Sequence, residues 1–135
     1  MIVVDASVAV GAISGNAACV RAIGDRRLVA PHLIDAEVAH AVRSMVVGGV
    51  LDARDARLLF GTWGRLAVDR LPMSGPISRV WELRHNLTAY DAMYVACAEM
   101  LSVPLVTADR GMAGATGVRC RIELVASEPG PERGG

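Results

Sequence analysis

The chain has 135 residues, with 14 acidic and 14 basic residues and no formal net charge. This length corresponds to one domain, and it suffices to bury a core without metal or disulfides. Apolar types make up 53% of the chain and charged types 21%, which excludes general disorder. All 14 basic residues are arginine, so enzyme classes that need a catalytic or phosphate-binding lysine are excluded.

The same composition predicts a cytoplasmic protein that does not enter a membrane. The longest uncharged runs, such as Ala6 to Ala22, are too polar to span a bilayer. Met1 is followed directly by an apolar run, without the basic segment and cleavage site of a signal peptide. The three cysteines form no CxxC pair, and an odd count excludes a complete disulfide framework. We therefore expect reduced thiols.

The first half of the chain alternates short apolar runs with helical periodicity. The β-branched run Ile2–Val4 predicts a buried strand, and Ser7 is expected to cap a helix over Val8–Ile13. The next expected elements are a short helix over Ala17–Ile23, a strand over Leu28–Ala30 and a helix over Leu33–Val47. The last helix has an apolar stripe of Ile34, Val38, Ala41 and Met45, and a glycine pair ends it.

The second half continues the alternation. Asp52 is expected to cap a helix that carries Leu58, Leu59, Trp63 and Leu66. The elements expected after it are a strand over Val68–Pro72, a helix opened by Pro76, a helix over Ala89–Leu101 started by Thr88, and strands over Pro104–Ala108 and Val118–Val125. Residues 127–135, rich in Pro, Gly and charge, are expected to be a disordered tail after a domain of residues 1–126.

Strands that alternate with helices predict parallel βαβ units, and hence a three-layer α/β/α fold with a mostly parallel central sheet. In such folds ligands bind outside the carboxyl ends of the strands. Asp5 and Asp109 each follow a predicted buried strand. We therefore expect these two carboxylates to meet at one edge of the sheet.

Four acidic residues are candidates for a site, and each also has an ordinary structural explanation. Asp5 equally fits a helix cap at a strand exit, and Asp109 before Arg-Gly fits a common turn. Glu37 lies on the flank of its helix's apolar stripe, where a border residue reaching water is slightly favoured. Thr88 and Asp91 fit a capping box, although Asp91 also begins an inward-facing row, which capping alone does not explain.

Taken together, the four acids describe a carboxylate cluster. Carboxylates that approach one another repel, which raises their pKa values unless a divalent cation neutralises them. An all-oxygen site suits Mg²⁺ or Mn²⁺ rather than Zn²⁺. The histidines His32, His40 and His85 are scattered and show no zinc-ligand spacing.

Four motifs carry a resemblance to a known family across residues 1 to about 126. They are Ile-Val-Val-Asp5-Ala-Ser7, Pro31-His-Leu-Ile-Asp-Ala-Glu37-Val, Leu87-Thr-Ala-Tyr-Asp91-Ala-Met-Tyr-Val-Ala-Cys-Ala-Glu99 and Leu105-Val-Thr-Ala-Asp109-Arg. In this order they resemble PIN-domain ribonucleases, specifically the VapC toxins of type II toxin–antitoxin pairs. One departure is Gly111-Met112, where such proteins often carry another basic residue.

The resemblance implies a Mg²⁺-dependent endoribonuclease toxin (with Mn²⁺ as a possible substitute), a homodimer, and a cognate antitoxin protein as inhibitor. RNA phosphodiester bonds would be hydrolysed by a metal-activated water held by the four carboxylates. Asp5 and Asp91 are expected to be the main ligands, completed by Glu37 and Asp109 directly or through water. Ser7, Thr88 and Thr107 are the expected supporting hydroxyls.

The main alternative is a catalytically silent PIN-like module that binds RNA or protein. Such a module should have lost at least one acid, whereas all four are present here. Haloacid-dehalogenase-like phosphatases and response-regulator receivers need a lysine that this chain lacks. Tyr90 and Tyr94 are one helical turn apart and are expected to pack inside the protein rather than to stack on bases.

Overall fold

The computed structural model of the chain describes residues 1–126, and it centres on one five-stranded parallel sheet. The order across the sheet is β3-β2-β1-β4-β5. The strands are β1 (Ile2–Val4), β2 (Leu28–Pro31), β3 (Val68–Leu71), β4 (Leu105–Thr107) and β5 (Ile122–Leu124). β1 is central, with Val3 opposite Val29 on one side and Leu105 on the other. The strand order reverses between β1 and β4, so a ligand site is expected at their carboxyl ends.

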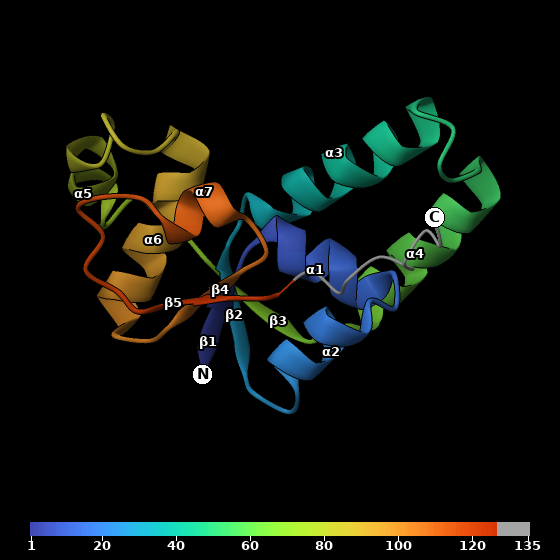
Figure 1. The fold of residues 1–135 in the computed structure, drawn as a ribbon, viewed down its shortest axis with the longest axis horizontal. Helices are drawn as coiled ribbons and strands as arrows, with labels where there is room; N and C mark the ends of the chain where they lie inside the picture. Colours follow the sequence, from blue (N-terminus) through green and yellow to red (C-terminus); the bar gives the residue numbers. More distant parts are fainter. Residues whose placement is uncertain (127–135) are drawn as a thin grey trace, which may run out of the picture.

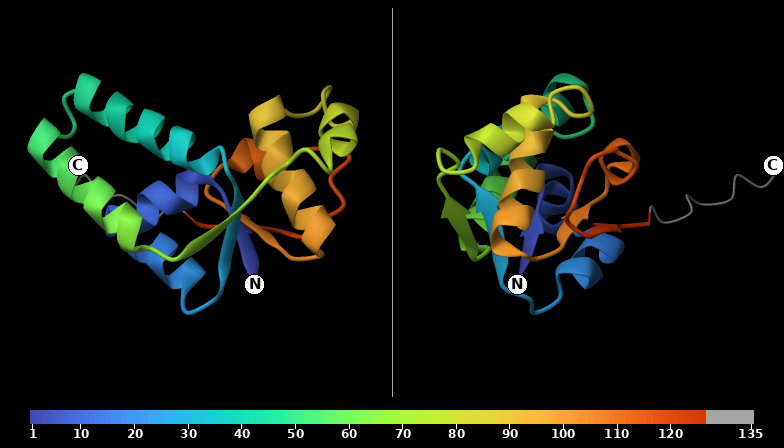
Figure 2. Two further views of the ribbon diagram at one scale, coloured as in Figure 1. Left: turned by 180° about the vertical axis from the view of Figure 1, so that it is seen from behind. Right: turned by 90° about the vertical axis from the view of Figure 1, so that its left-hand side faces the viewer.

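Seven helices surround the sheet in the described residues. They are α1 (Ala6–Ile13), α2 (Ala17–Ile23), α3 (Ile34–Val47), α4 (Ala53–Arg65), α5 (Ile77–Glu82), α6 (Ala89–Leu101) and α7 (Arg110–Ala113). α5 and α6 lie on one side of the sheet, and α1 to α4 lie on the other (Figure 1). Seen from behind, α3 and α4 form an antiparallel pair that extends away from the sheet (Figure 2). The predicted three-layer α/β/α architecture is confirmed.

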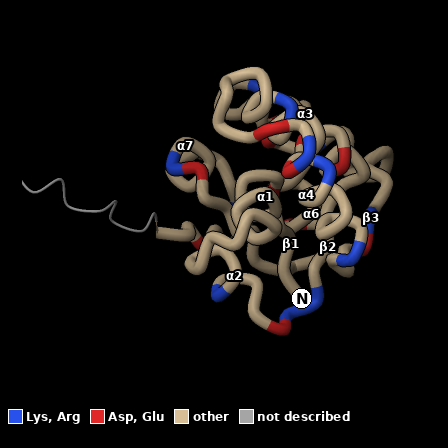
Figure 3. The backbone as a smooth tube through the Cα atoms, turned by 90° about the vertical axis from the view of Figure 1, so that its right-hand side faces the viewer, with Lys and Arg blue, Asp and Glu red and all other residues tan. Residues whose placement is uncertain are grey.

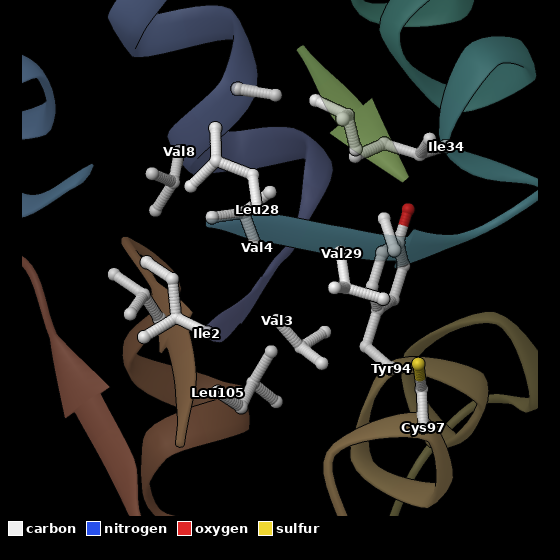
Figure 4. Packing of buried hydrophobic residues seen from close by; sticks show 14 of the residues in the cluster. Ile2, Val3, Val4, Val8, Leu28, Val29, Ile34, Tyr94, Cys97 and Leu105 are labelled. Carbon is white, nitrogen blue, oxygen red and sulfur yellow. The ribbon is translucent and has the colours of Figure 1, made fainter. Parts of the chain in front are cut away.

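The core forms where β1 and α6 meet. Ile2, Val3 and Val4 are at most 1% exposed, because β1 is covered on both faces. α6 contributes an almost continuous buried run from Tyr94 to Ala98. These side chains pack together in Figure 4, with Tyr94 and Cys97 of α6 against Val3 and Val29. The core therefore fixes both the carboxyl end of β1 and the position of α6.

Three details of the predicted elements are corrected. Ser7 does not cap α1: the helix begins at Ala6, and Asp5 Oδ1 accepts the Val8 N–H at 3.1 Å. The inward row of α3 is Ile34, Val38 and Val42, while Ala41 and Met45 are only half-buried. The strand predicted over Val118–Val125 is limited to β5, because the Arg119 N–H donates to the Glu99 carboxylate instead of to a neighbouring strand.

A largely buried ion pair joins the helices on one side of the sheet to the segment before β5. Arg79 of α5 donates to both carboxylate oxygens of Glu99 on α6, at 2.7 and 3.0 Å. It also donates to the Gly117 carbonyl at 2.6 Å. The Arg79 and Glu99 side chains are only 17% and 12% exposed, so solvent screens this pair weakly.

Within residues 1–126, no single helix is long and apolar enough to cross a membrane. Together α1 and α2 are long and apolar enough for a membrane span, but they are bent by 115° relative to each other, and core helices of folded domains have the same length and composition. The predicted disordered tail lies outside the described residues.

Candidate functional site

Asp5 stands at the carboxyl end of β1 and is only 4% exposed. Its Oδ1 accepts from Ser7 Oγ at 2.6 Å and from the Val8 N–H at 3.1 Å. Its Oδ2 accepts from Thr107 Oγ1, at the end of β4, at 2.5 Å. Asp5 is thus a buried carboxylate at the sheet edge and the cap of α1, which confirms the cap interpretation. Its role in a site stays a prediction.

The two hydroxyls that bind Asp5 also hold the chain that follows β4. Ser7 Oγ accepts from the Ala108 N–H at 3.0 Å, and Thr107 Oγ1 accepts from the Asp109 N–H at 3.0 Å. The exits of β1 and β4 are therefore joined by two hydroxyl bridges. These bridges place Asp109 beside Asp5.

Asp109 and Asp91 each lie at the start of a helix. Asp109 Oδ1 accepts from the Gly111 N–H at 2.8 Å, which caps α7 and confirms the turn interpretation. Thr88 Oγ1 accepts from the Asp91 N–H at 3.2 Å, which confirms Thr88 as the cap of α6. Glu37 lies half-buried on the first turns of α3. Each acid is therefore set near the carboxyl edge of the sheet by the end of a strand or helix.

The pKa shifts show that the four carboxylates share one electrostatic environment. Burial raises the pKa of Asp5 above its ordinary value, against the lowering effect of its hydrogen bonds from Ser7, Thr107 and Val8. Burial also raises the pKa of Asp91, and the charges of Asp109, Glu37 and Asp5 raise it further. The charges of the other three predicted acids thus all reach Asp91.

Tyr94 is a member of this environment that sequence reasoning assigned only to packing. It is 1% exposed, and its hydroxyl has no hydrogen-bond partner among residues 1–126. Burial raises the pKa of Tyr94 well above its ordinary value, and the nearby Glu37 carboxylate adds to this. Figure 4 shows the hydroxyl directed toward the side where Ile34 begins α3. The available signal was the spacing of three residues from Asp91, which places both on one helix face.

The four acids have the donor atoms that an oxygen-binding cation requires, but their side chains are not arranged in a coordination sphere. Within residues 1–126, no group of three or more His, Cys, Asp or Glu side chains is arranged to hold a metal ion. The ion pairs found among the described residues use other acids: Asp35, Asp69, Glu82, Glu99 and Glu123. The side chains available in the cluster are carboxylates, whose oxygens are the donors that hard divalent cations prefer. His32, His40 and His85 are all exposed.

A cavity of about 730 Å³ adjoins the acids between α1 and α3. It is lined by Ser7 and Glu37 from the cluster, by His40, by Tyr90, and by small apolar side chains. Tyr90 is 66% exposed, so the expectation that it packs inside the protein is wrong, while for Tyr94 it is confirmed. Tyr90 belongs to the first turn of α6, which extends beyond the edge of the core.

Among residues 1–126, the basic positions on the face seen in Figure 3 do not form one stripe. In Figure 3 they lie on separate elements, and at α7 a basic and an acidic position are adjacent.

Comparisons with known proteins agree with this fold. The family model described as "PIN domain" matches residues 2–117. Ribonuclease VapC9 of Mycobacterium tuberculosis is 45% identical over 125 residues, which cover 93% of this chain and 98% of that protein. The crystal structure of PAE2754 from Pyrobaculum aerophilum has a TM-score of 0.66 at 25% identity, covering 90% of this chain and 89% of that one. A toxin–antitoxin complex from Klebsiella pneumoniae contains a chain with the same fold, with a TM-score of 0.65 at 17% identity and coverage of 95% and 100%.

The fold and the family match define a PIN-domain protein. Within that class, the identity to VapC9 extends over nearly the whole of both chains. This chain belongs to the VapC family of PIN-domain toxins. The predicted resemblance is thereby confirmed.

Proposed function

We propose that this protein is a divalent-metal-dependent endoribonuclease, the toxin of a toxin–antitoxin pair. The observation that carries the proposal is the meeting of Asp5, Glu37, Asp91 and Asp109 at the carboxyl edge of the sheet, where burial and mutual repulsion raise the pKa of Asp91. The name of the 45%-identical relative, a ribonuclease, supports the reaction class.

Asp5 and Asp91 are the proposed main ligands, with Glu37 and Asp109 completing the set directly or through water. A bound Mg²⁺, or Mn²⁺ in its place, would lower the pKa of a water molecule and would place positive charge beside the phosphoryl oxygens. The chain itself holds the carboxylates in position. Ser7 and Thr107 fix both oxygens of Asp5, and Thr88 fixes the helix start that carries Asp91. These contacts support the proposed role of the three hydroxyls.

The alternative of a silent binding module is less well supported. A module that only bound RNA would gain nothing from four carboxylates beside the polyanion. Here all four are retained, and they interact although this raises the pKa of Asp91. Apart from these four acids the chain has 10 acidic residues and 14 arginines, a balance of +4. The arginines suit bidentate contact with phosphates.

The partners in this proposal are an RNA substrate, a cognate antitoxin protein and a second copy of the chain. The Klebsiella pneumoniae complex supports the antitoxin, because a chain of this fold occurs there in a toxin–antitoxin assembly. The exposed side chains of Trp81, Val50 and Leu58 supply apolar surface for such contacts. We further propose that the protein acts in the cytoplasm.

The experiment is incubation of the purified protein with total cellular RNA, with and without Mg²⁺ or Mn²⁺, followed by mapping of the cleaved ends. The proposal predicts discrete cuts that EDTA abolishes. RNA that is bound but stays intact with either metal would instead support the silent module.

A further inference from the structure

The cavity between α1 and α3 is continuous with the acid cluster. Glu37 belongs to both, and Ser7 lines the cavity while it donates to Asp5, so a group in the cavity lies next to the carboxylates. Its volume of about 730 Å³ is in the range of small-ligand pockets. The four-carboxylate site leaves the rest of this space without an assigned role.

The lining favours an uncharged group. Val10 of α1 and Ala36 of α3 are among the small apolar side chains that form its walls. A phosphate inside the cavity, away from the cation proposed at the acids, would be repelled by the Glu37 carboxylate, because like charges at short range are unfavourable. A neutral aromatic heterocycle meets no such repulsion.

Two rim residues have chemistry that suits such a heterocycle. Tyr90 is 66% exposed beside the cavity, and an aromatic ring in this position gains by stacking on another flat ring. His40 is exposed on the same rim and provides a ring nitrogen for hydrogen bonding.

We propose that this cavity is a nucleobase subsite, in which a base adjoining the cleaved phosphodiester of single-stranded RNA stacks on Tyr90. The inference rests on the proposed ribonuclease function, because a phosphate held at the acids brings the neighbouring base to the cavity they share. In this proposal Tyr90 is a residue that determines which RNA the protein binds.

The test compares two RNAs on matched variants. Binding of a short unstructured oligoribonucleotide, and of an abasic oligomer of equal length, is measured by fluorescence anisotropy. Ca²⁺ replaces Mg²⁺ as an oxygen-seeking cation, and RNA integrity is checked on gels. Tyr90→Ala should weaken binding of the intact RNA about tenfold, as expected for one lost stacking contact. Binding of the abasic oligomer should stay as in wild type, and Tyr90→Phe should retain wild-type affinity for both.

A second pair of variants fills the cavity without touching Tyr90. Ala36→Trp should weaken binding of the intact RNA and leave the abasic oligomer unaffected. Ala39→Trp is the control, because it adds the same volume to α3 in the groove shared with α4. It should bind both RNAs as wild type does.

The possible failures are distinguishable. Equal affinity of wild type and Tyr90→Ala for intact RNA, or equal losses on both RNAs, overturns the subsite. If Tyr90→Ala and Ala36→Trp both bind RNA as wild type does but no longer bind the antitoxin, the cavity takes a protein side chain and the proposal is wrong. A wild type that prefers intact over abasic RNA but never cuts with Mg²⁺ or Mn²⁺ contradicts the ribonuclease function and leaves the subsite standing.

Discussion

Thr107→Val removes one hydroxyl from the centre of the site and keeps the shape of the side chain. Thr107 is 0% exposed, donates to Asp5 Oδ2 at 2.5 Å and accepts from the Asp109 N–H at 3.0 Å. Water has no access to replace either contact. A lost charge-assisted bond in a buried position costs about 2–3 kcal/mol of unfolding free energy. For a domain of this size, that lowers the melting temperature by about 10 °C.

The same substitution should change the pH dependence of cleavage. The Thr107 hydrogen bond lowers the pKa of Asp5, so its loss raises that pKa further above the ordinary value. Asp5 must be ionised to act as a ligand, and the acidic limb of the rate profile should therefore move to higher pH. The stability deficit should be present above the folded-state pKa of Asp5 and shrink as the pH falls through it, because protonation removes the charge-assisted part.

Thermal melts and cleavage rates over a pH series measure both effects, with Thr107→Ser as the matched control. Thr107→Ser keeps the hydroxyl and should retain the wild-type acidic limb. A Thr107→Val variant with wild-type stability and an unmoved acidic limb would show that this hydroxyl does not position Asp5.

Three further predictions concern stability. Asp91→Asn should raise the melting temperature of the metal-free protein at neutral pH, because the raised pKa of Asp91 means that its ionised form destabilises the fold. This gain should vanish in acid, where Asp91 is protonated, and Mg²⁺ should stabilise the variant less than wild type. Arg79→Met should lower the unfolding free energy by about 3 kcal/mol in urea titrations, because it leaves the largely buried Glu99 carboxylate without a cation. An additional Glu99→Leu substitution should recover part of the loss, and no recovery would contradict this account of the pair. Gly11→Ala should destabilise the protein, because the added Cβ would overlap Cys19 Sγ, whereas Gly64→Ala in α4 has open space around its Cβ and should stabilise it by up to about 1 kcal/mol. Equal melting temperatures of these two variants would refute the difference.

The architecture could be predicted from the sequence because local and global signals agree. The β-branched runs before Asp5 and Asp109 are short and uninterrupted, which is typical of strands buried on both faces. Thr88 at the start of α6 is a cap whose hydroxyl bonds as expected. Asp5 and Ser7 are both good cap residues two positions apart, so the sequence alone did not decide between them.

The site was harder to predict, because it depends on how helices cross the sheet. The half-buried position of Glu37 near Asp91 follows from the way α3 leaves β2, which no spacing within α3 records. Tyr90 and Tyr94 are one turn apart, and the helical pattern gave them the same environment. Only the edge of the core separates the exposed ring of Tyr90 from the buried ring of Tyr94. The RNA sequence that is cut depends on surfaces that the motifs do not describe.

The most direct test of the central claim is the rate of RNA cleavage with Mg²⁺ by Asp5→Asn and Asp91→Asn. Each change removes a carboxylate charge while keeping the side-chain volume, and circular dichroism can verify that the fold is intact. Asp55→Asn, the same change at an exposed position on the first turn of α4, is the control. The carboxylate-cluster account predicts that both site variants lose cleavage while Asp55→Asn keeps the wild-type rate. A folded Asp5→Asn or Asp91→Asn variant that cuts RNA at nearly the wild-type rate would contradict it.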